Sequence, residues 1–265
     1  MHPLPHWLDA PRLLGFPGFR LALGSDGLVT AEAQLSRADA ADVAARLRGL
    51  GFAGHALHCE VTPALDRSVV RRARTADARR RRHTSEGFTR AGVRLDAEAR
   101  YSLTPEALAF TLGEHAAGRR VLDCGCGAGG NAIGFARAGC EVVAVERDAA
   151  RLSLARHNAA VYGVSERIRF VHGDALAVAA DEPADVLFVD PPWGKGYDHV
   201  RTTVADLPLL EQLLPLRQRF AELWAKVPPS FDPGTLPNAE ARALFGVAQG
   251  DAARVKFVWL SLKGA

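Results

Sequence analysis

The chain has 265 residues, 48% of them hydrophobic, and carries a formal net charge of +3 at pH 7. This length permits one large globular domain or one domain with a smaller appendage. No apolar run approaches the roughly 20 residues of a membrane span, and residues 1–6 lack the basic and then apolar pattern of a secretory signal. The four cysteines fit a reduced compartment and do not form two pairs at zinc spacing. We therefore expect a cytoplasmic protein with no bound metal ion and no membrane partner.

Residues 1–90 predict a small α+β module. Two apolar stretches, 20–23 and 28–33, flank a Gly-Ser-Asp-Gly turn, which is typical of a hairpin. A helix is expected over 36–48, because it starts with serine, a common N-cap, and is followed by glycine. The apolar run 55–61 is interpreted as a further strand.

Arginines concentrate in a helix that we expect to begin at Pro63 and to continue towards His83. Seven arginines fall within residues 71–82, and Asp77 is the only acidic residue among them. Blocks of like charge repel one another and are often interaction segments, although a solvated helix face carries the same pattern. We predict that this helix binds a phosphate backbone, with contacts from Arg79, Arg80, Arg81 and Arg82.

The second expected domain, 91–265, opens with a helix start at Thr104 and Pro105, which match an N-cap and a first helical position. Strands and helices then alternate, which favours a parallel sheet with helices on both faces. The expected strands are 119–123, 141–146, 167–172, 185–190, 223–227 and 254–262, and the expected helices are 130–138, 148–162 and one near 206–224. The fold class is therefore α/β, with a Rossmann-like doubly wound sheet.

A glycine-rich turn follows the first of these strands. The segment Val121-Leu-Asp-Cys-Gly-Cys-Gly-Ala-Gly-Gly-Asn131 ends a strand on an acid, supplies four glycines and starts a helix. Glycine suits a strand that reverses tightly while its backbone approaches a ligand, because a Cβ would clash in both places. Glu146 ends the next strand about 20 residues further on, where an acid can bind ribose hydroxyls. Asp123, just before the first glycine, suits a ligand with a cationic α-amino group.

These features resemble the class I S-adenosylmethionine-dependent methyltransferases. The resemblance implies S-adenosylmethionine as cofactor and S-adenosylhomocysteine as product. Asp123 and the glycines would hold the methionine part, Glu146 the ribose, and Asp174 the adenine amine. The candidate cofactor-binding residues are Asp123, Gly125, Gly127, Gly129, Asn131, Glu146, Arg147, Asp174 and Ala175.

The motif Asp190-Pro-Pro-Trp-Gly194 directly follows an apolar strand, at the sheet edge where open α/β sheets bind ligands. Pro191 and Pro192 stiffen the loop and remove two N–H donors, which leaves carbonyl acceptors. A nucleobase exocyclic amine is a poor nucleophile until acceptors hold its N–H groups. Asp190 and the Pro191 carbonyl can do this, and Trp193 can stack on the base.

Four segments together resemble the trimethylguanosine synthase family, the RNA cap guanine 2-amino methyltransferases, over about residues 90–262. They are 92–96, 101–106, 154–163 and the Asp-Pro-Pro-Trp-Gly motif. In that family the motif's tryptophan stacks on 7-methylated guanine, so Trp193 would inherit this role. Asp190 stands where the family usually has serine. The resemblance implies a class I methyltransferase fold, with catalysis by Asp190, Pro191, Pro192 and Trp193 and substrate contacts from Trp193, Gly194, Lys195, Tyr101, Ser102 and Thr104.

We therefore expect an N-methyltransferase that acts on a guanine 2-amino group in RNA, in a cap-like nucleotide or in a guanine-like small molecule. Two alternatives remain open. The chain could methylate an adenine or cytosine amino group of nucleic acid, or it could be a catalytically silent RNA-binding protein on the same fold. The sequence is compatible with a monomer or a dimer.

Overall fold

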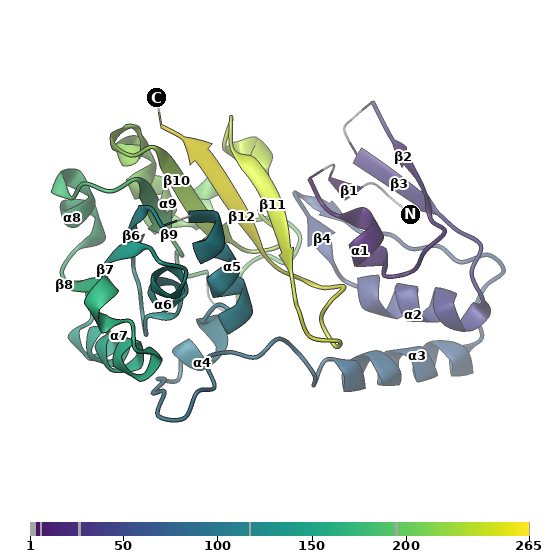
Figure 1. The fold of residues 1–265 in the computed structure, drawn as a ribbon. Helices are drawn as coiled ribbons and strands as arrows, with labels where there is room; N and C mark the ends of the chain where they lie inside the picture. Colours follow the sequence, from purple (N-terminus) through teal and green to yellow (C-terminus); the bar gives the residue numbers. More distant parts are fainter. Residues whose placement is uncertain (1–3, 6, 26–27, 117, 194–195, 265) are drawn as a thin grey trace.

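The computed structural model describes residues 4–5, 7–25, 28–116, 118–193 and 196–264, and Figure 1 shows a small amino-terminal part beside a larger sheet domain. The small part has a three-stranded sheet in the order β1-β3-β2 and a two-stranded hairpin, β4-β5. Its elements are β1 (Leu4–Pro5), α1 (Ala10–Leu14), β2 (Arg20–Leu23), β3 (Leu28–Glu32), α2 (Arg37–Leu47), β4 (Gly51–Phe52), β5 (His55–Ala56) and α3 (Arg67–Arg80).

The predicted hairpin and first helix of this part are present, and two other predictions are corrected. β2 and β3 pair antiparallel, and α2 begins after Ser36, whose side chain accepts a hydrogen bond from the Asp39 amide. The strand expected over 55–61 is limited to β5, because its partner β4 is also only two residues long. The arginine-rich helix begins at Arg67, later than Pro63.

The amino-terminal part shares its core with the end of the chain. Leu13, Leu14 and Phe52 are buried in one cluster with Phe245, a residue of the edge strand β11 (Glu240–Phe245). Figure 1 shows β11 next to the amino-terminal elements. The two parts are therefore joined by a common apolar interface.

The larger domain contains a seven-stranded sheet in the order β11-β12-β10-β9-β6-β7-β8. Strands β10, β9, β6, β7 and β8 are parallel, whereas β12 runs antiparallel to both β10 and β11. Its helices are α4 (Ala99–Ser102), α5 (Glu106–Ala116), α6 (Gly130–Arg137), α7 (Ala149–Tyr162), α8 (Ala175–Asp181) and α9 (Pro208–Leu213). Its other strands are β6 (Arg120–Cys124), β7 (Glu141–Glu146), β8 (Ile168–His172), β9 (Val186–Val189), β10 (Glu222–Val227) and β12 (Val255–Lys263), and short 3-10 helices lie at 165–167, 204–206, 214–219 and 233–235.

The sheet is covered on both faces, which confirms the predicted Rossmann-like doubly wound fold. Apolar residues of α5, α6 and α7 pack on one face and those of α8 and α9 on the other. Successive strand residues alternate between the two clusters, as Leu122 and Val121 do, because side chains of a strand point to opposite faces. No helix in the described part of the chain is long and apolar enough to cross a membrane.

The helix expected near 206–224 is present but much shorter than predicted. An α-helix covers only Pro208–Leu213, a 3-10 helix follows over Leu214–Arg219, and β10 already begins at Glu222. Pro215 lies just after the α-helix, and proline removes a helix hydrogen bond and clashes with the preceding turn. Strand β11, which follows the proline-rich region 228–237, and the short α8 were not predicted.

A close crossing of α5 and α6 positions the segment that precedes α5. A Cβ on Gly134 would lie 2.4 Å from the Ala109 carbonyl oxygen, and one on Gly113 would lie 2.6 Å from the Gly134 carbonyl oxygen. Glycine at both positions therefore allows the two helix backbones to touch. As a result, α5 is held against the sheet, and the residues before it reach the carboxyl ends of the strands.

Candidate active site

A cavity of about 960 Å³ opens at the carboxyl ends of β6, β7, β8 and β9. Ligands bind at this edge in open α/β sheets. Most of the residues expected from the sequence line it: Tyr101, Ser102, Thr104, Gly125, Gly127, Asn131, Glu146, Arg147, Asp174, Ala175, Asp190, Pro191, Pro192 and Trp193. Gly194 and Lys195 lie outside the described residues.

Glu146, at the end of β7, binds the glycine turn through a hydrogen bond. Its Oε2 accepts from the Gly127 amide at 2.9 Å and its Oε1 accepts from the Asp148 amide at 2.9 Å. Each carboxylate oxygen has a second lone pair, so Glu146 can still accept from two hydroxyl groups. The Glu146 carboxylate is thus oriented in the way that a ribose site needs.

Three polar side chains beside the turn have buried atoms without hydrogen bonds of normal geometry to the described residues. They are Asp123, with both carboxylate oxygens, Asn131, with Oδ1, and Thr104, with Oγ1. Asp123 is fully buried and lies behind the cavity wall, and Gly129, packed against Ala155, does not line the cavity either. Buried polar atoms without partners are uncommon and call for a ligand or water. A ligand ammonium group in the cavity could donate to Asn131 Oδ1 and would carry its positive charge near the Asp123 carboxyl.

The raised pKa of Asp123 predicts that a proton is released when such a ligand binds. Burial, followed by the charges of Asp190 and Glu146, raises the pKa of Asp123 to about 8. The carboxyl is therefore mostly protonated at pH 7, and a cationic ammonium group would favour its ionised form. Calorimetric titration of S-adenosylhomocysteine at pH 7, in buffers of different ionisation enthalpy, should report release of up to about one proton.

The raised pKa of Asp123 also makes the stability of the ligand-free protein depend on pH. The pKa of Asp123 is higher in the folded chain than its ordinary value of 3.8, so its contribution to stability is fully present below about pH 4 and is lost as the pH rises towards about 8. Asp123→Asn should remove both the stability change and the proton release. If proton release persisted in that variant, another group would be its source.

Asp174 caps α8 at the end of β8. Its Oδ1 accepts from the backbone amides of Leu176 and Ala177 at 2.9 and 3.1 Å. Any contact with an adenine amine would therefore be made by Oδ2. Ala175 and Arg147 lie on the same side of the cavity, at the ends of β8 and β7.

Asp190 follows β9, and two donors converge on one of its oxygens. Oδ2 accepts from Asn131 Nδ2 at 2.9 Å and from Lys226 Nζ at 2.8 Å. No donor of the described residues reaches Oδ1, so this oxygen can accept from a ligand amine. Sequence reasoning missed Lys226, although a single lysine in the otherwise uncharged run Leu-Trp-Ala-Lys-Val, in a buried strand, was a usable signal.

Trp193 lies between the cavity and an aromatic cluster. It lines the cavity and packs partly against the core, and its ring meets that of Tyr197 edge-on at 5.0 Å. The amino-terminal part also reaches this loop, because the Gly54 amide donates to the Val200 carbonyl at 3.1 Å. Trp193 therefore combines a packing role with a surface that a base could stack on.

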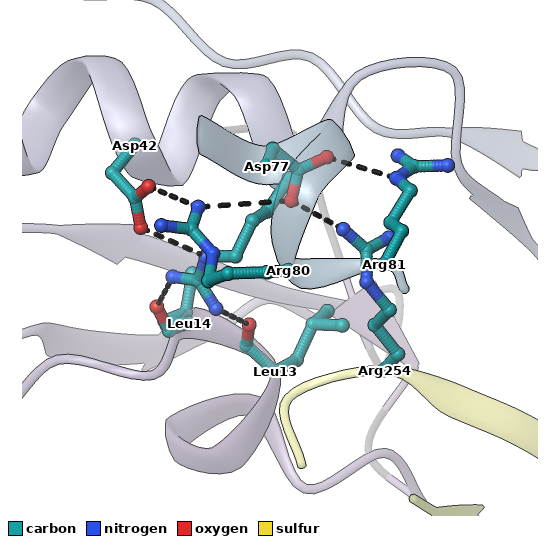
Figure 2. Close-up of polar contacts among 8 residues, drawn as sticks. Leu13, Leu14, Asp42, Asp77, Arg80, Arg81 and Arg254 are labelled. Carbon is teal, nitrogen blue, oxygen red and sulfur yellow. Dashed lines mark hydrogen bonds and ion pairs between the residues drawn. The ribbon is translucent and has the colours of Figure 1, made fainter. Parts of the chain in front are cut away.

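The predicted arginine contacts divide into two groups. Figure 2 shows Arg80 paired with Asp42, and Arg81 and Arg254 paired with Asp77. The prediction of phosphate contacts is revised for Arg80 and Arg81, because each already forms an ion pair with a carboxylate of the protein. The side chains of Arg79 and Arg82 are exposed and form no ion pair within the described structure, but none of the four arginines lines the cavity.

Comparison with known proteins identifies relatives of the sheet domain. Residues 118–227 match a family described as RNA cap guanine-N2 methyltransferase. Trimethylguanosine synthase of Schizosaccharomyces pombe is 34% identical over 113 residues, which are 39% of this chain and 47% of that protein. The Saccharomyces cerevisiae trimethylguanosine synthase is 31% identical over 137 residues, 48% of this chain and 43% of that protein. The chain thus spans less than half the length of these relatives.

Among solved structures, an RNA methyltransferase from Salinibacter ruber in complex with S-adenosylhomocysteine is similar over 60% of this chain and 92% of its own, with 21% identity and a TM-score of 0.44. The segment that matches the family carries both the glycine turn and the Asp-Pro-Pro-Trp motif.

Proposed function

We propose that this chain, which is similar to the trimethylguanosine synthases, is an S-adenosylmethionine-dependent methyltransferase that methylates the exocyclic 2-amino group of a guanine in RNA. The observation that carries the proposal is the geometry of Asp190. Its Oδ2 is held by Asn131 and Lys226, which leaves Oδ1 for an N–H group of the acceptor amine. The glycine turn that would hold the cofactor lines the same cavity.

The residues around the cavity suit the cofactor. Glu146 would bind the ribose, and Asn131 would face the positive charge of the methionine part, which the buried Asp123 would offset from behind the cavity wall. When bound, the cofactor supplies an electrophilic methyl group on its sulfonium.

Asp190 and the Pro191 carbonyl would hold the acceptor amine by its N–H groups. This withdraws the nitrogen lone pair from the ring and directs it towards the methyl group, while Trp193 stacks on the base. Once methylated, the amine is acidic enough to lose its proton to water, so the reaction needs no strong base. Positioning is the main contribution, worth up to roughly 7–11 kcal/mol in favourable cases.

A methyl-transfer assay tests the acceptor. Tritiated S-adenosylmethionine is offered with total RNA, DNA, 7-methylguanosine nucleotides or guanosine, and labelled RNA is digested to nucleosides. We expect label in RNA, in 2-amino-methylated guanosine. Label in methylated adenosine or cytidine would establish the alternative amino-methyltransferase, label only in the small molecules would exclude RNA as the acceptor, and no transfer to any acceptor would favour a silent RNA-binding protein.

The exposed arginines of the α3 region are proposed to hold the RNA backbone. Arg80 and Arg81 are paired with carboxylates, whereas the other arginines of the cluster are exposed and form no ion pair in the described structure: Arg71, Arg72, Arg74, Arg79 and Arg82. The chain leaves α3 directly towards the cavity, since Thr84 and Ser85 line it. RNA bound along these arginines would therefore lead to the methylation site.

Serine at Arg74, Arg79 and Arg82 together should flatten the salt dependence of RNA binding. Each lost phosphate contact lowers the slope of log affinity against log salt by roughly 0.7–0.9, so three contacts lower it by about 2. Fluorescence anisotropy at several salt concentrations measures this slope. Arg80→Ser serves as the contrast, because it removes one of the two arginines that pair with Asp42 and should lower thermal stability while leaving the slope unchanged. An unchanged slope in the triple variant would contradict the RNA contact.

A further inference from the structure

Lys226 lies next to Asp190 because of the strand register. β10 and β9 are parallel neighbours that pair Ala225 with Val189, so the next residues along the two strands are Lys226 and Asp190. Lys226 is only 3% exposed and shares a sheet face with Trp224. The ammonium group of Lys226 is thus buried beside the carboxyl end of β9.

The contacts of Lys226 all belong to the cavity. Nζ donates to Asp190 Oδ2 at 2.8 Å and to the Ser102 carbonyl at 3.2 Å. It also lies 5.7 Å from the ring centre of Trp193 and 5.6 Å from that of Phe257. Lys226 therefore connects the segment before α5, the Asp-Pro-Pro-Trp loop and β12.

Stability alone does not explain a lysine at this position. Burying an ion pair costs hydration free energy, and a well-packed apolar residue of similar volume is often at least as stabilising. The neighbouring rings of Trp193 and Phe257 would accept a methionine equally well. The chain also has a strong arginine preference, since only four of its 33 basic residues are lysines. The compact ammonium can approach one carboxylate oxygen where a planar guanidinium would need more room.

The charge of Lys226 also bears on its surroundings. Asp123 lies near two other carboxyl groups, Asp190 and Glu146, whose charges, after burial, contribute to its raised pKa. Among the described residues, Lys226 is the only cation that forms an ion pair with Asp190. Lys226 therefore offsets part of the negative charge beside the buried Asp123.

We propose that Lys226 is a positioning residue for methyl transfer: together with Asn131 it holds Asp190 Oδ2, so that Oδ1 faces the acceptor amine. The inference rests on the proposed function, because Asp190 must be the group that binds the amine. Lys226 then acts only through Asp190 and does not itself contact the acceptor or the cofactor.

A double-mutant cycle tests this role. The variants are Lys226→Met, which keeps the volume and removes the charge, Asp190→Asn, and the two combined. We expect Lys226→Met to lower kcat on the order of 10²-fold by misplacing the carboxylate, without weakening S-adenosylhomocysteine binding. In the Asp190→Asn background the same change should cause no further loss, because the residue through which Lys226 acts is already altered. Lys226→Arg, which keeps the charge, should retain more activity than Lys226→Met.

The matched control is Lys263→Met, the same change at the exposed end of β12, which should leave kcat unchanged. Full activity of Lys226→Met, or a further loss when it is added to Asp190→Asn, would overturn the positioning role. If Lys226→Met did not fold, Asp190→Asn would be compared with the double variant, in which both charges are absent. Equal activities of these two variants would support the positioning role, and a lower activity of the double variant would overturn it. Undiminished activity of Asp190→Asn would instead contradict the proposed mechanism. The experiment thus distinguishes a failure of the positioning role from a failure of the proposed function.

Discussion

Replacing Asp190 with alanine should lower methyl transfer on the order of 10³-fold while leaving cofactor affinity nearly unchanged. The carboxylate is the only side chain of the Asp-Pro-Pro-Trp loop that can accept the N–H of the acceptor amine, and the loss of one aligned polar group in an active site has effects of roughly 10²–10³-fold. Initial rates with labelled cofactor and RNA measure the first quantity, and calorimetric titration of S-adenosylhomocysteine measures the second.

Two companion variants make the Asp190 result interpretable. Asp181→Ala removes an exposed carboxylate at the end of α8 and should leave the rate unchanged. Asp190→Asn keeps the side-chain shape, so it separates the loss of the carboxylate from a disturbance of Asn131 and Lys226. Full turnover of Asp190→Ala would show that the amine is held elsewhere.

Replacing Glu146 with alanine should weaken cofactor binding by about 3 kcal/mol, roughly 10²-fold, because hydrogen bonds to a charged group contribute about 1.5–3 kcal/mol each. The variant loses the acceptors for the ribose and also releases the Gly127 and Asp148 amides that shape the turn. Calorimetric titration gives the affinity, and kcat at saturating cofactor should stay close to that of the unmodified protein.

Glu141 provides the matched control, because it lies at the other end of the same strand. Its side chain is 63% exposed and pairs with Arg167 at 3.1 Å, and surface ion pairs contribute little to stability. Glu141→Ala should therefore leave the cofactor affinity unchanged. Equal affinities of Glu146→Ala and the unmodified protein would exclude Glu146 from the ribose site.

The sequence predicts the elements that depend on local patterns. Strands β6 to β9 and helices α6 and α7 were expected within about two residues, because apolar runs and glycines mark their ends. The cavity residues were found for the same reason, since ligands of such sheets bind where the strands end. Pro215 was a local signal too, and neglecting it made the helix expected before β10 too long.

Other features depend on residues that meet only in the folded chain. Lys226 and Asp190 are 36 positions apart, and Arg80 and Asp42 are 38 positions apart. No local pattern pairs such residues, so some arginines of a cluster that looked uniformly available already form ion pairs within the protein. β11 was missed because prolines precede it and because its burial depends on the amino-terminal part.

The shared core around Phe245 has a consequence for how the molecule unfolds. The edge strand β11 is covered by residues from the first 60 positions, such as Leu13 and Phe52, so the amino-terminal part and the sheet contribute to each other's burial. An interaction that stabilises one part against unfolding therefore also stabilises the other, and both should melt in one cooperative transition. A ligand that stabilises the glycine turn would accordingly raise the melting temperature of the arginine-bearing helix as well.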